Sequence, residues 1–175
     1  MKILLPFFLL LSIFCHAQHV KTTVDEFTGD TIIKTDFVTL ESVMSNRVTG
    51  TYTTKFAFAK YMDGVYLLAM VKSVHIGTID EGEIFYMKFD DGEVMELANR
   101  LDVITEFSYS LLMGENENIF RLQFELTPGE LEGLASKQLT KCRILCSKGQ
   151  LTIESNNRLS GDVMDLARKF QQAIK

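Results

Sequence analysis

Helix signals are confined to the last third of this chain, and that order limits the folds it can adopt. Up to about residue 126 the sequence consists of short strand-like stretches divided by turn residues. Alternating strands and helices would instead favour a parallel sheet covered on both faces. We therefore predict an α+β fold, a curved antiparallel sheet of about eight to ten strands with two late helices, the C-terminal one packed on the sheet. A pure β-sandwich is the alternative.

The clearest strand lies at residues 119–126, where apolar and polar side chains alternate without a break. A period of two places one face of a strand against the core and the other in water. The polar residues 114–118 before it are typical of a turn. Residues 103–113 should therefore pair with this strand as a hairpin.

Turn residues predict four further features of the sheet. An N-terminal hairpin should bend at Thr28-Gly29-Asp30, because glycine tolerates a positive φ. Residues 65–76 are apolar on both faces, which indicates a central strand covered on both sides and joined to residues 52–61 through Met62-Asp63-Gly64. Asp91-Gly92 is suited to a type I′ turn between residues 83–89 and 93–98. A last hairpin should join residues 141–146 to 151–155.

Two helices follow from capping and periodicity. Thr127-Pro128-Gly129-Glu130 forms a capping box with proline at the first helical position, so a short helix should run to about Ser136. A terminal helix should start near Ser160. Its apolar residues recur at spacings of three and four, so that one stripe faces the sheet. These are Val163, Leu166, Ala167, Phe170 and Ile174.

The first seventeen residues have the pattern of a secretory signal peptide. Lys2 precedes an apolar run at residues 3–14, and Cys15-His16-Ala17 supplies small residues for cleavage. We expect the mature protein to begin at Gln18, to form one β-rich α+β domain over residues 18–175, and to be periplasmic or secreted without a transmembrane segment. A lipid anchor at Cys15 is the rival interpretation, but lipoprotein signal peptidases prefer a small residue at the position that Phe14 occupies.

The charged and sulfur-containing residues exclude several ligands. The net charge is −5 and the basic residues are scattered, which argues against nucleic acid. Cys142 and Cys146 should lie on one strand face with Cα atoms roughly 13 Å apart, beyond the limit of about 7 Å for a disulfide. We expect two buried thiols. A zinc site is the weaker alternative, because the spacing of the two cysteines does not suit it.

No catalytic, cofactor-binding or metal-binding residue is predicted. The chain lacks the G-x-S-x-G, H-E-x-x-H, Gly-rich phosphate-loop and C-x-x-C motifs. His75 should be a hydrogen-bonded residue at the end of the central strand; the alternative is a hydrolase in which it acts with Ser73 or a nearby carboxylate. The carboxylates at residues 80–83, 90–93 and 115–117 are expected in solvated turns, because they do not match a calcium loop.

Glycan binding has little support in the composition, because the chain has no tryptophan to stack on sugar rings. Tyr52 and Tyr61 could substitute, although half-buried strand aromatics are the commoner case. His19 could help the terminal amine to bind copper, but cyclisation of Gln18 would block that amine.

The start of the mature chain resembles a known group of proteins. Val24-Asp25-Glu26-Phe27-Thr28-Gly29-Asp30 and the strand-like residues 31–40, with the late Leu-x-x-Gly-Glu-Leu helix and the basic strand around Arg143, resemble uncharacterised small exported proteins of Gram-negative bacteria. The resemblance implies an envelope or secreted location and no particular activity. We expect a noncatalytic exported envelope protein, a binding module for a protein or envelope ligand that the sequence does not identify.

Overall fold

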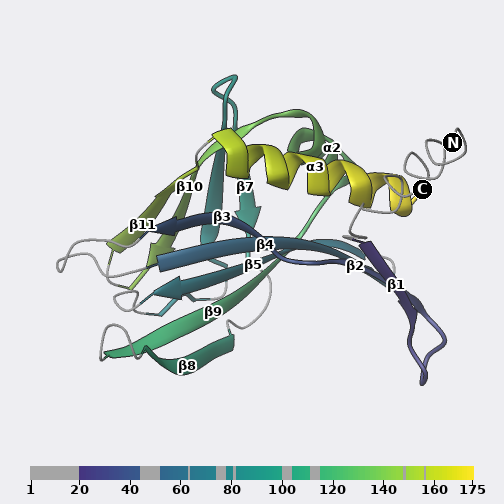
Figure 1. Ribbon diagram of the computed structural model, residues 1–175, viewed down its shortest axis with the longest axis horizontal. Coiled ribbons are helices and arrows are strands. Elements are labelled where there is room, and N and C mark those ends of the chain that lie inside the picture. The colour runs from purple at the N-terminus through teal and green to yellow at the C-terminus, as the bar shows by residue number, and fades with distance from the viewer. Residues whose placement is uncertain are drawn as a thin grey trace, which may run out of the picture.

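The chain folds into two antiparallel sheets and two helices (Figure 1). The computed structural model describes residues 20–43, 52–62, 64–73, 78–80, 82–99, 104–110, 115–147, 149–155 and 157–175. Within these ranges eleven strands form a seven-stranded and a four-stranded sheet. The α+β class, the antiparallel pairing and the two late helices are confirmed, but the strands divide into two sheets where the sequence predicts one.

The seven-stranded sheet has the order β1-β2-β4-β5-β9-β8, and β3 lies next to β2 on the same edge of β4. The predicted hairpins β1–β2, β4–β5 and β8–β9 are confirmed. Its strands are β1 (Val20–Val24), β2 (Thr31–Thr35), β3 (Val38–Val43), β4 (Tyr52–Tyr61), β5 (Gly64–Ser73), β8 (Ile104–Ser110) and β9 (Glu115–Glu125).

The predicted turn at residues 114–118 is mostly wrong, because β9 already begins at Glu115. Residues 115–118 pair with residues 107–110 of β8 and so extend the hairpin beyond its apolar part. The three positions 115–117 are therefore in a strand and not in a solvated turn. Ladder hydrogen bonds here outweigh the turn preference of Asn and Glu.

The four-stranded sheet has the order β11-β10-β6-β7. Its strands are β6 (Ile84–Phe89), β7 (Val94–Ala98), β10 (Leu139–Cys146) and β11 (Gly149–Glu154). The hairpins β6–β7 and β10–β11 are confirmed, but the predicted type I′ turn is wrong. Gly92 has φ +88° while Asp91 has no positive φ, and the Gly92 N–H donates to the Phe89 carbonyl at 3.1 Å. This is a type I turn followed by a left-handed glycine.

α2 (Pro128–Ser136) follows β9 of the large sheet, and α3 (Asn157–Ala173) follows β11 of the small sheet. α2 begins with the predicted capping box, in which the Glu130 N–H donates to the Thr127 hydroxyl at 3.3 Å and the Thr127 N–H to the Glu130 carboxylate at 2.6 Å. α3 begins three residues before the predicted Ser160. α3 contacts α2, β3 and β10 (Figure 1).

Strand pairing along one edge of β4 is interrupted where the chain passes from β2 to β3, and a side chain there supplies a hydrogen bond to β4. The buried Thr35 hydroxyl accepts a hydrogen bond from the Phe58 N–H at 2.8 Å. We expect Thr35→Val to destabilise the protein by about 1–3 kcal/mol, because the buried N–H loses its acceptor while the side chain keeps its shape. Urea unfolding measures the change. Thr22→Val on the exposed part of β1 should have almost no effect, and equal midpoints for both variants would contradict this assignment.

Lys137, at the end of α2, forms ion pairs with the β6–β7 turn. Its ammonium contacts the carboxylates of Asp91, at 2.7 Å, and Glu93. The hydrogen bond to Asp91 raises the pKa of Lys137 to about 12, and the same bond lowers the pKa of Asp91 from its ordinary 3.8. These ion pairs therefore contribute stability above pH 3.8, and that stability is lost as the pH falls through the lowered pKa of Asp91.

We expect Lys137→Met to destabilise the protein at neutral pH and to match the wild type once Asp91 is protonated. Urea midpoints at neutral pH and well below pH 3.8 measure this convergence. Lys88→Met, which removes an exposed ammonium from β6, is the control and should not change the acid dependence. A Lys137→Met deficit that stays constant with pH would show that the ion pairs do not cause it.

Candidate ligand-binding groove

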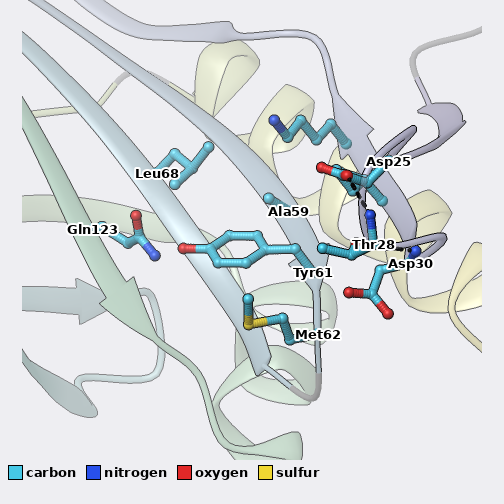
Figure 2. Close-up of a pocket in the computed structure, with 10 residues that line it drawn as sticks. Asp25, Thr28, Asp30, Ala59, Tyr61, Met62, Leu68 and Gln123 are labelled. Carbon is cyan, nitrogen blue, oxygen red and sulfur yellow. Dashed lines mark hydrogen bonds between the residues drawn. The ribbon is translucent and has the colours of Figure 1, made fainter.

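A groove of about 390 Å³ lies on the outer face of the seven-stranded sheet, beside the β1–β2 hairpin (Figure 2). Its floor is formed by Ala59 of β4 and Leu68 of β5, with Gln123 of β9 at one end. The hairpin forms the opposite wall. Strands β2, β4, β5 and β9 are neighbours in the sheet, so the groove crosses four strands.

Register and side-chain size create this groove. β2 pairs with β4 at only two positions, Ile33 with Lys60 and Lys34 with Ala59, so the rest of the hairpin is not held against β4. Neighbouring residues of a strand point to opposite faces, and Phe58 belongs to the core. Ala59 therefore points to the outer face, where it lines the groove although its neighbours leave it fully buried.

The hairpin presents two carboxylates to the groove. The carboxylate of Asp25 accepts hydrogen bonds from the N–H groups of Phe27 and Thr28, at 2.8 and 2.9 Å. The bond from Thr28 and then that from Phe27 lower the pKa of Asp25, so it stays ionised at neutral pH. Gly29 has φ +78°, which confirms the predicted turn and brings Asp30 to the same wall.

Two stacked phenol rings stand beside the floor. The rings of Tyr61 and Tyr66 lie 4.3 Å apart with an interplanar angle of 13°. Tyr61 lines the groove, and its hydroxyl points toward Gln123 in Figure 2. Burial, and then the neighbouring Tyr66, raise the pKa of Tyr61 above 10, so its phenol stays protonated and can donate a hydrogen bond.

Met62 forms part of the rim in a conformation that its side chain disfavours. Its φ is +51°, in the left-handed region, and 72% of the residue is exposed. The left-handed conformation costs a residue with a side chain roughly 1–2 kcal/mol. Met62 follows Tyr61 in the tight turn that ends at Gly64, and the twist of such a hairpin favours a positive φ.

Gly64 gives the Tyr66 ring its place, because a Cβ at Gly64 would overlap the phenol. We expect Gly64→Ala to displace Tyr66 and to destabilise the protein by about 0.5–1.5 kcal/mol, the usual worth of an aromatic pair. The pKa of Tyr61 should also fall toward 10, which ultraviolet titration measures. Gly161→Ala in α3 has open space around its Cβ and should not destabilise the protein. An unchanged Tyr61 titration would contradict the packing.

Comparison with known proteins supplies no function for this groove. Neither a protein-family model, nor a curated protein, nor a solved structure matches the chain. What the groove can bind therefore has to follow from the chemistry of its own side chains.

Several residues considered from the sequence lie outside the described residues or away from the groove. The signal peptide, Cys15, His19 and His75 lie outside the described residues. Residues 90–93 form the turn that Lys137 contacts, and Glu83 donates its N–H to the Asp80 carbonyl at 3.3 Å. Within the described ranges, no three His, Cys, Asp or Glu side chains gather as a metal site. No helix in the same ranges is long and apolar enough to cross a membrane.

The two cysteines differ more in environment than the sequence predicts. Both lie in β10 and neither forms a disulfide, as expected. Cys142 is buried, whereas Cys146 is only half-buried near the β10–β11 turn. Their spacing of four residues keeps them on one face, and the position of Cys146 at the end of the strand accounts for its exposure.

Sequence reasoning missed the groove, although it named Tyr61. A signal was present in β4, where Ala57 and Ala59 alternate with Phe56 and Phe58. Bulky side chains on one face and small ones on the other indicate a strand whose second face is close to something else. Nothing local could show that the β1–β2 hairpin lies beside Ala59 and lines the same groove.

Proposed function

We propose that this protein is a noncatalytic exported envelope protein that binds a ligand in the groove on the outer face of its large sheet. The groove itself supports the proposal, because a volume of about 390 Å³ is in the range typical of small-molecule sites. Its lining combines apolar side chains with polar groups that can fix the orientation of a ligand. In this proposal the sheet is curved and carries α3 on one face, which leaves the opposite face for the ligand.

Export is part of the same proposal. Residues 1–17 would be removed as a signal peptide, the mature chain would begin at Gln18, and Cys15 would carry no acyl group. The intact mass of the protein purified from the native envelope or culture medium tests this. A mass that includes a diacylglyceryl group on Cys15 would replace the soluble form by a lipid-anchored one.

Filling the groove tests the binding function. Ala59→Phe places a ring on the groove floor, while Ala98→Phe adds the same ring at an exposed site of β7 as the matched control. Native mass spectrometry of the exported protein should show one small molecule on the wild type and the Ala98 variant and none on the Ala59 variant. Because Ala59 is fully buried, Ala59→Phe should lower the thermal midpoint, and a single cooperative transition in each variant would show that both fold.

Two results would overturn the proposal. Retention of the ligand by Ala59→Phe would place binding elsewhere in the molecule. Turnover of a screened substrate that His75→Gln abolishes, without a change in the thermal midpoint, would favour the hydrolase alternative in which His75 acts with Ser73 or a nearby carboxylate.

A further inference from the structure

We propose that the groove binds an uncharged oligosaccharide, with one sugar ring stacked on Tyr61. This inference rests on the proposed binding function and adds the chemical class of the ligand. A pyranose ring has an apolar face of C–H groups and a rim of hydroxyl groups. A site for it needs a flat apolar platform surrounded by both hydrogen-bond donors and acceptors.

Tyr61 supplies the platform. Tyr66 covers one face of its ring at 4.3 Å, and Gly64 leaves the space that Tyr66 occupies. The ring is therefore held in place before a ligand arrives, which lowers the entropy cost of binding. Tyr61 also lines the groove, together with Ala59.

The polar side chains around this platform supply both donors and acceptors, as the hydroxyl groups of a sugar require. Asp25 and Asp30 offer acceptors, Lys34 offers donors, and the amide of Gln123 offers both. Each sugar hydroxyl can donate and accept, so it can use all of them. An anionic ligand would face the ionised Asp25, and an alkyl chain would remove these charges from water without compensation.

Met62 extends the apolar surface at the rim, at a cost to stability. Its exposed side chain lines the groove although its φ of +51° suits glycine better. If this side chain contacts the ligand, Met62→Gly should raise the thermal midpoint and at the same time weaken binding. A purely structural turn residue would not give that pair of opposite effects.

The experiment is calorimetric titration of the mature protein with linear uncharged oligosaccharides of glucose, galactose, mannose and N-acetylglucosamine. We expect the wild type to bind one of these series. Tyr61→Ala should weaken binding about tenfold or more, as expected when a stacking contact is lost. Tyr61→Phe, which keeps the ring, should lose less. Tyr86→Ala, on β6 of the other sheet, is the matched control and should bind as the wild type does.

The outcomes separate this inference from the binding function itself. If no series binds, or if the bound sugar is unaffected by Tyr61→Ala, the oligosaccharide inference is wrong. The binding function still stands in that case if Ala59→Phe releases a natural ligand of another class. If Ala59→Phe releases nothing that the wild type holds, the binding function fails as well. Weaker sugar binding by Met62→Gly together with a higher thermal midpoint supports the rim contact.

Discussion

Replacing Phe85 by alanine is expected to remove about 3–5 kcal/mol of stability, a large share of the roughly 5–15 kcal/mol available to a domain. Phe85 lies on β6 and is 1% exposed. Its ring meets that of Phe56 edge to face at 5.9 Å and stacks on that of Phe124 at 5.1 Å. Phe56 and Phe124 belong to the large sheet, so this one side chain joins the two sheets.

Urea unfolding of Phe85→Ala measures the loss. Phe85→Leu should recover part of it, because a smaller cavity remains. Val94→Ala removes an exposed apolar side chain from the same sheet and should change the free energy of unfolding by less than about 0.5 kcal/mol. If Phe85→Ala is as mild as Val94→Ala, the two sheets are held together by contacts other than these rings.

The division into two sheets is the main feature that the sequence does not reveal. Each hairpin is encoded locally, as in the turn at Gly29 or the capping box at Thr127, and these predictions are confirmed. β10, in contrast, pairs with β6 across more than fifty residues of chain. Such a pairing depends on which strand edges remain open after the hairpins form, and hydrophobic periodicity carries no information about it.

The groove is hidden from the sequence for a related reason. Tyr61 is correctly expected to be a half-buried strand aromatic, but its partner Tyr66 is identified only by the β4–β5 register. Asp25 and Asp30 look like ordinary turn residues, and they are turn residues. Only the position of the hairpin beside Ala59 brings these polar groups to the groove.

The terminal helix should depend on Phe170 as strongly as the two sheets depend on Phe85. Phe170 is fully buried, and its ring stacks on that of Phe58 at 5.5 Å with an interplanar angle of 25°. Phe170→Ala leaves a cavity between α3 and β4 and should cost about 3–5 kcal/mol. Gln172→Ala changes an exposed side chain of the same helix and is the control.

Hydrogen exchange can show how this loss is distributed. We expect Phe170→Ala to lose protection first in α3 and α2, because these helices contact each other, while β5 and β9 keep theirs. Phe58 and Ala59 are neighbours on β4 with side chains on opposite faces, so the helix and the groove share one strand. At temperatures where the variant stays folded, ligand binding in the groove should persist. Loss of binding with β4 still protected would show that α3 controls the groove through this strand.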